Sequence, residues 1–200
     1  MLGPITDLLN ENLTRVENLV SLYGPEKPGR RRVQDTDILR GALVLLHAGL
    51  EDYLRSLMVW KIDTYPPEVL NNYMFPNGNN KRGIQKISLG ELASSKGRLV
   101  DDVITEVVKS HLDRYQSFND LGEVKTALKQ CGIAPEAVEA RNFGKLHEMI
   151  ARRHNIVHKA DRNDVIGGQG NHGTQSLRKG TVEGYVASVK DIRDFVTDSL

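Results

Sequence analysis

Residues 152–159 read Arg-Arg-His-Asn-Ile-Val-His-Lys, and this segment contains the side chains that RNA cleavage without a metal requires. An imidazole titrates near neutral pH, so His158 could take the proton from a ribose 2′-hydroxyl or give one to a leaving 5′-oxygen. A guanidinium binds a phosphate through two hydrogen bonds and stabilises the charge that develops on its oxygens, a role that suits Arg153. The segment therefore predicts a site for phosphate chemistry.

Helical geometry places a condition on that site. On an ideal helix, Arg153 and His158 lie about 140° apart, and Arg152 and His158 about 120° apart. The two side chains converge only if the helix ends or bends between them, or if a second subunit supplies one of them. The alternative interpretation is a surface arginine and a histidine that the helix macrodipole favours near the C-terminus.

The histidines also raise the question of a metal site. His147, His154 and His158 lie on one helix face, and the last two have the i, i+4 spacing of zinc-binding helices. The residues between them are Asn, Ile and Val, so the glutamate expected in such a motif is absent. We predict neither a metal nor a cofactor.

The composition excludes several classes of protein. The chain has 200 residues, with 27 basic and 26 acidic residues and a formal net charge of +1, so any binding of nucleic acid must come from local basic patches. Such patches are candidates within residues 25–34, 76–98 and 145–160, although solvated loops are usually charged as well. One cysteine, Cys131, excludes a disulfide framework and favours a reducing cytoplasm. No apolar run is long enough for a membrane span, and we expect a cytoplasmic protein.

The elements that must position these side chains are helical. Apolar residues recur every three or four positions along most of the chain. The pattern over residues 36–62 is apolar on more than one face and predicts a central buried helix. No stretch alternates at period two, so no strand is expected. The sequence predicts an all-α fold, an up-down bundle of four main helices plus shorter ones, as a single domain over residues 1–200 with an insertion at about 64–98.

The motif and the order of the helices resemble the HEPN domains (higher eukaryotes and prokaryotes nucleotide-binding), an all-α family. The family motif is an arginine, often followed by a polar residue, and then four to six residues before a histidine. Arg153 to His158 matches with four intervening residues, and Arg152 with five. The stretch 46–55 also resembles the long core helix of the family, which frequently carries an acidic residue, here Glu51. The resemblance covers residues 1–60 and 99–200.

The resemblance implies a metal-independent endoribonuclease that forms a homodimer, with the motifs of two subunits facing each other in one cleft. Such proteins cleave RNA as toxins or phage-defence effectors, so an antitoxin or another defence-system protein is an expected partner. Other members bind RNA or act as scaffolds without catalysis. The alternative is therefore a non-catalytic module that binds RNA or protein in a regulatory or defence complex.

The resemblance also implies roles for individual residues. The catalytic set is His158 for proton transfer, Arg153 for the phosphate, and Asn155 and Glu51 for positioning. The RNA-binding set is Arg152, His154 and Lys159.

Two residues of the central helix carry alternatives of their own. Glu51 orients His158 or an arginine across the cleft, or else it pairs with Arg55 one turn later. His47 is predicted to be a packed, hydrogen-bonded histidine.

Overall fold

The computed structural model describes residues 1–24, 33–73, 79–81, 84–86, 88–163 and 173–200. Parts of the predicted insertion, of the basic segments 25–34 and 76–98 and of the glycine-rich segment 161–180 lie outside these residues. Over the described residues the chain is mostly helical, which confirms the all-α prediction. The elements are α1 (Leu2–Ser21), α2 (Val33–Trp60), a short 3-10 helix (Ile62–Thr64), α3 (Pro67–Leu70), β1 (Asn79–Lys81), β2 (Ile84–Lys86), α4 (Leu89–Ala93), α5 (Val100–Tyr115), α6 (Leu121–Gln130), α7 (Pro135–Ala140), α8 (Gly144–Lys159) and α9 (Lys179–Ser199).

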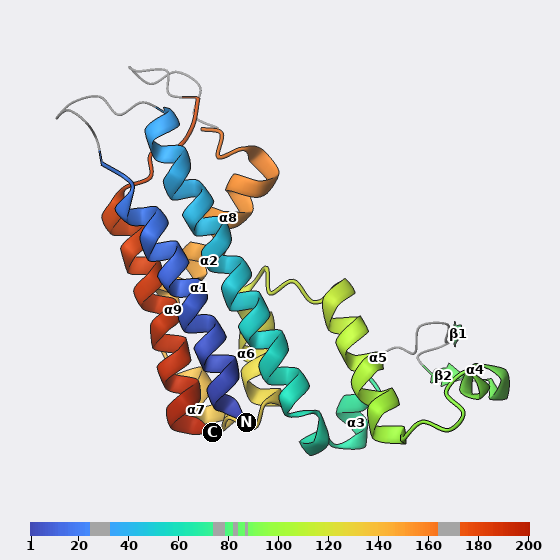
Figure 1. Cartoon of the computed structure of the whole chain (residues 1–200). Helices are drawn as coiled ribbons and strands as arrows, with labels where there is room; N and C mark the ends of the chain where they lie inside the picture. The colour runs from blue at the N-terminus through green and yellow to red at the C-terminus, as the bar shows by residue number, and fades with distance from the viewer. Residues whose placement is uncertain (25–32, 74–78, 82–83, 87, 164–172) are drawn as a thin grey trace.

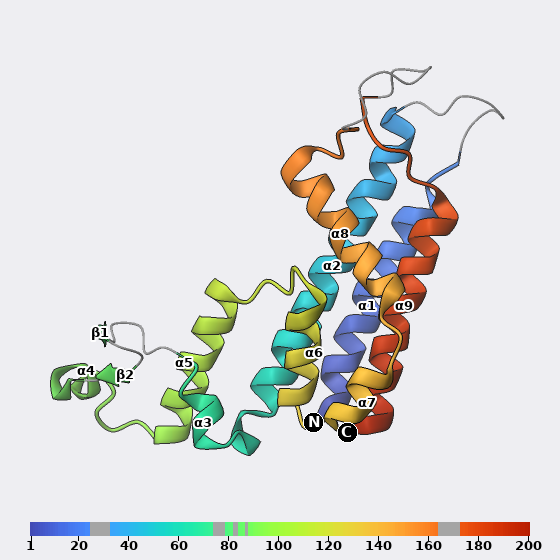
Figure 2. The same cartoon turned by 180° about the vertical axis from the view of Figure 1, so that it is seen from behind.

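Helix α2 is the centre of the packed bundle. It contacts α1, α6, α8 and α9, and α1, α2 and α9 run side by side (Figure 1). Helices α6, α7 and α8 cover the other side (Figure 2). Burial of its apolar stripe confirms the predicted central helix; the stripe consists of Leu39, Leu43, Leu46, Leu50, Leu54 and Leu57. Removing these side chains from water is the main stabilising contribution to the bundle.

An arm extends sideways from this bundle. Helix α5 packs against α2. Helix α3 lies at the lower end of α5 on the side toward α2, whereas α4 and the strands lie on the side of α5 away from the bundle (Figures 1 and 2). The strands β1 and β2 pair in antiparallel fashion, so the expectation of no strand is corrected. Each strand is three residues long, which is too short for period-two alternation to appear in the sequence.

A buried ionic triad marks the end of α8. Ala160 and Asp161 both have positive φ values, 49° and 54°, and this left-handed backbone ends the helix. The Asp161 carboxylate is fully buried. Its Oδ2 accepts hydrogen bonds from Arg40 Nε at 2.7 Å and Arg152 Nη2 at 2.8 Å. The triad of Arg40, Arg152 and Asp161 therefore fixes the last turn of α8, where His158 lies.

Within the described residues, no helix is long and apolar enough to cross a membrane.

Candidate functional site

Arg153 lies where α8 passes α2 and the connector between α5 and α6. Its Nη1 donates a hydrogen bond to Asn119 Oδ1 at 2.7 Å, and its Nη2 lies 3.8 Å from Glu51 Oε1. The Arg153 side chain is 18% exposed. Its Nε is buried and has no hydrogen-bond partner among the described residues. The guanidinium is therefore held on two edges and keeps limited access to solvent.

Glu51 connects several charged and titratable groups. Its Oε2 lies 3.7 Å from Arg55 Nη2, and its Oε1 lies 3.3 Å from His47 Nδ1. Burial raises the pKa of Glu51, while Arg55 and Arg153 act in the opposite direction. The structure brings Glu51 to both Arg55 and Arg153, so the two arginine contacts considered from the sequence coexist.

His47 is fully buried on α2, and its Nε2 lies 3.3 Å from the backbone oxygen of Phe118. This confirms the predicted packed, hydrogen-bonded histidine. Burial, together with the positive charge of Arg153, lowers the pKa of His47 to about 4. The ring is thus neutral at physiological pH.

The connector supplies groups to this site that sequence reasoning missed. The backbone carbonyl oxygen of Gln116 accepts two hydrogen bonds from Arg55. Phe118 has a positive φ of 47°, and its carbonyl faces His47. Asn119, at the end of the connector, accepts a hydrogen bond from Arg153. Asn119 and Asp120 are residue types that cap helices, so a cap before α6 has a signal in the sequence, whereas nothing marks the left-handed backbone of Phe118.

His158 lies in the last turn of α8, on a different side from Arg153. It is exposed, as are His154 and Lys159, and the ring centroids of His154 and His158 are 4.5 Å apart. Asn155 is half-buried, and its backbone carbonyl accepts a hydrogen bond from the backbone N–H of Asp161 at 3.0 Å. One copy of the chain therefore does not bring the arginine and the histidine of the motif together.

Arg152 has a different environment from the one expected of an RNA-binding residue. Its Nη2 donates to Asp161 and to the carbonyl oxygens of Gln175 and Ser176, and its Nη1 donates to the Gln175 side chain. The side chain is 15% exposed. These bonds occupy much of the guanidinium and tie α8 to the segment before α9; the RNA-binding role of Arg152 stays a prediction.

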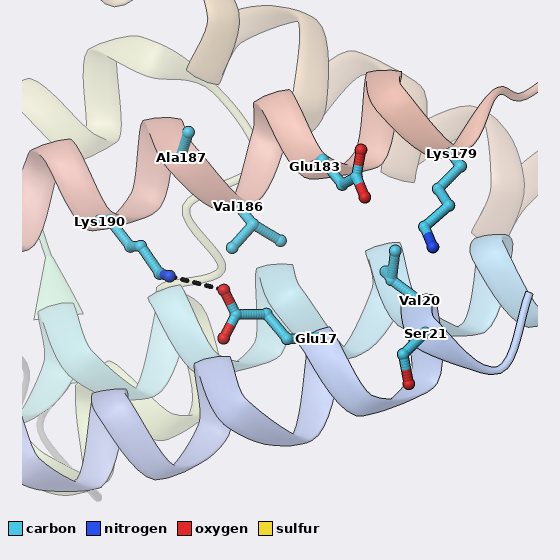
Figure 3. Close-up of a pocket in the computed structure, with 8 residues that line it drawn as sticks. All are labelled: Glu17, Val20, Ser21, Lys179, Glu183, Val186, Ala187 and Lys190. Carbon is cyan, nitrogen blue, oxygen red and sulfur yellow. Dashed lines mark hydrogen bonds and ion pairs between the residues drawn. The ribbon is translucent and has the colours of Figure 1, made fainter.

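Neither of two surface pockets contains a predicted site residue. One, with a volume of about 320 Å³, lies between α1 and α9 (Figure 3). It is lined by Glu17, Val20, Ser21, Lys179, Glu183, Val186, Ala187 and Lys190. Its two lysines and two glutamates balance, and Lys190 pairs with Glu17. The other, about 610 Å³, lies along α4 and α5 and includes Arg98 and Glu106, which pair with each other.

Metal ligands do not gather in the part of the chain that the structure describes: no group of three or more His, Cys, Asp or Glu side chains there could hold an ion. The groups that the structure brings together at Arg153 are imidazole, guanidinium, amide and carboxyl groups on α2, α8 and the connector.

Comparison with protein-family models, with curated proteins and with solved structures gave no match for this chain. The resemblance to HEPN domains, which depends on Arg153, His158 and Glu51, stays a prediction.

Proposed function

We propose that this chain is a metal-independent endoribonuclease that acts as a homodimer. The observation that supports this most is the setting of the motif. Arg153 is fixed by Glu51 and Asn119, while His158 stands exposed on the same helix. A positioned phosphate ligand and a solvent-accessible acid–base group are the two components that cleavage by a neighbouring hydroxyl requires.

The reaction is a transesterification within the RNA strand. The ribose 2′-oxygen attacks the adjacent phosphorus, the bond from phosphorus to the 5′-oxygen breaks, and a 2′,3′-cyclic phosphate and a 5′-hydroxyl result. The His158 imidazole accepts the 2′-hydroxyl proton, and the imidazolium that forms gives a proton to the leaving 5′-oxygen. Arg153 stabilises the charge on the phosphate oxygens, with Asn155 and Glu51 in positioning roles. DNA lacks the attacking hydroxyl and is left intact.

A second copy of the chain completes the site. Because Arg153 and His158 lie on different sides of α8, we propose that His158 of one protomer approaches Arg153 of the partner subunit across a two-fold axis. Isologous dimers juxtapose the same patch from both copies in this way. The exposed His154 and Lys159 then contact the RNA backbone next to the cut.

The biological setting that we propose is a cytoplasmic toxin or phage-defence effector, with an antitoxin or another defence protein as its partner. The buried, unbridged thiol of Cys131 suits a reducing compartment.

The first test is cleavage of a structured RNA in EDTA. Loss of the acid–base group in His158→Ala should lower the rate by at least about 100-fold, and Arg153→Ala should lower it as well. His147→Ala is the matched control, because His147 is exposed on the same helix but outside the motif. Cleavage that survives in His158→Ala, or that requires a divalent metal, contradicts the mechanism. RNA binding without cleavage in the wild type favours the non-catalytic module.

The second test mixes Arg153→Ala with His158→Ala under conditions that exchange subunits. If each site combines Arg153 from one copy with His158 from the other, half of the dimers are mixed and one of their two sites is intact. About a quarter of the wild-type activity should then return. No recovery in a mixture shown to contain mixed dimers contradicts the shared site.

A further inference from the structure

The His47 ring lies between two oxygen atoms. Its Nε2 is 3.3 Å from the Phe118 carbonyl oxygen, and its Nδ1 is 3.3 Å from Glu51 Oε1. A carbonyl oxygen only accepts hydrogen bonds, so the contact with Phe118 requires the ring proton to be on Nε2. A neutral imidazole carries one N–H, and therefore Nδ1 presents a lone pair to the Glu51 carboxyl group.

The contact between His47 Nδ1 and Glu51 Oε1 joins two polar atoms that lack a hydrogen bond within the described part of the chain. His47 Nδ1 and Glu51 Oε1 are both buried, and neither has a hydrogen-bond partner among the described residues. If Glu51 were ionised, two lone pairs would face each other out of reach of water. A single proton between the two atoms replaces two unsatisfied buried groups by one hydrogen bond.

We propose that His47 and Glu51 hold one proton between them, and that this proton controls how strongly Glu51 holds Arg153. The proton is on the carboxyl oxygen of Glu51 and is donated to Nδ1 of a neutral His47. Burial favours this form, because it raises the pKa of Glu51 and lowers that of His47.

Charged groups face the pair from three helices. Arg55 on α2 and Arg153 on α8 favour the ionised carboxylate, whereas Glu123 on α6 and burial oppose ionisation. With the proton bound, Glu51 is neutral and its attraction for Arg153 is weak. Without it, the carboxylate draws Arg153 into a full ion pair and competes with a phosphate for the same guanidinium.

This regulation rests on the proposed ribonuclease function, whereas the shared proton does not. If binding of an RNA phosphate and binding of the proton are coupled, each strengthens the other by the same factor. RNA affinity should then fall as the pH rises through the pKa of Glu51.

The shared proton is tested on the full chain without RNA. Long-range ¹H–¹⁵N spectra of the histidines between pH 5 and 9 should place the His47 proton on Nε2, with His47→Gln identifying its signals. The Nδ1 resonance should shift in one step at a pH above 4.5, the ordinary carboxyl value. Carboxyl ¹³C signals of the wild type should show Glu51 titrating at that same pH, which requires no variant.

Glu51→Gln should keep the proton on Nε2, since the glutamine amide donates to Nδ1, and should abolish the step. Glu123→Gln is the matched control, because that carboxylate faces the cluster without touching the ring, and it should keep the step. A proton found on Nδ1, or a step that persists in Glu51→Gln, overturns the proposal.

The link to Arg153 is tested with an RNA that carries 2′-deoxyribose at the cleavage position. Its affinity for the wild type should fall across the same pH step, and its affinity for Glu51→Gln should not. If the Nδ1 resonance shows the step but no RNA binds, the regulation and the ribonuclease function are both refuted, whereas the shared proton is not. If RNA is cleaved but the step does not occur, the shared proton and the regulation that depends on it are refuted, whereas the ribonuclease function is not.

Discussion

Replacing Asp161 by asparagine tests the triad that ends α8. The Asp161 side chain is fully buried, and the side chains of its partners Arg40 and Arg152 are 8% and 15% exposed. Removing one member of a buried ion pair leaves an uncompensated charge and costs about 3–5 kcal/mol. Asparagine keeps the shape and one acceptor oxygen, so we expect the lower end, about 3 kcal/mol. It also tolerates the left-handed φ of 54°, which excludes backbone strain as the cause.

Asp161→Ala removes the remaining acceptor oxygen and adds a backbone contribution. Alanine lacks the short polar side chain that makes the left-handed conformation tolerable, so this variant should lose about 1 kcal/mol more than Asp161→Asn. The matched control is Asp37→Asn. Asp37 pairs with the same Arg40 at 3.1 Å but is 60% exposed, so its loss should cost less than about 1 kcal/mol.

The assay is urea unfolding followed by far-UV circular dichroism, with a thermal melt as a second measurement. For a chain of this size, Asp161→Asn should lower Tm by about 6–12 °C. Equal losses of stability in Asp161→Asn and Asp37→Asn would refute the reasoning, because Asp161 is buried between two arginines whereas Asp37 is exposed and pairs with one.

Two further predictions concern helix ends and pH. Gly132 follows α6 with a φ of 96°, so Gly132→Ala should lower the free energy of unfolding by about 1–2 kcal/mol. Gly41 lies at an exposed position of α2 with open space around it, so Gly41→Ala should raise the free energy of unfolding by about 0.5–1 kcal/mol. Urea unfolding measures both variants. A change in the same direction for both would contradict the left-handed conformation of Gly132. His47 has a folded pKa of about 4 against an ordinary value of 6.5, so the unfolded chain binds more protons between these values. Stability should therefore fall by up to about 3 kcal/mol as the pH drops from 6.5 to 4. Glu51, with its raised pKa, changes stability in the opposite direction. The contribution of His47 is therefore measured as the difference between wild type and His47→Gln in the slope of unfolding free energy against pH. Identical slopes would rule this contribution out.

The helices of this protein can be predicted from the sequence because helical periodicity depends on residues three or four positions apart. The stripe of leucines predicted α2 as the central helix, and it is buried. The ends of α6 also have short-range signals: Asp120 caps its start, and Gly132, with a positive φ, follows its end. The hairpin β1–β2 gave no such signal, since three residues contain too little alternation.

The surroundings of the motif were decided by the tertiary structure. Arg152 and Arg153 are neighbours of the same type, and sequence preferred Arg153 for the phosphate only because a polar residue follows it. Packing separates them: Arg152 points into the triad, whereas Arg153 reaches Glu51 and Asn119. Successive residues of a helix point about 100° apart, so the docking of α8 on α2 determines which groups each arginine contacts.

The same reason explains the proton site. The sequence placed His47 and Glu51 one turn apart on α2, and this spacing alone brings them within reach of each other. The oxygen on the other side of the ring comes from Phe118, whose left-handed backbone no residue preference predicts. Periodicity determines what each helix buries, whereas contacts between α2, α8 and the connector arise only when the helices pack and hold the connecting backbone in conformations that its own residues do not favour.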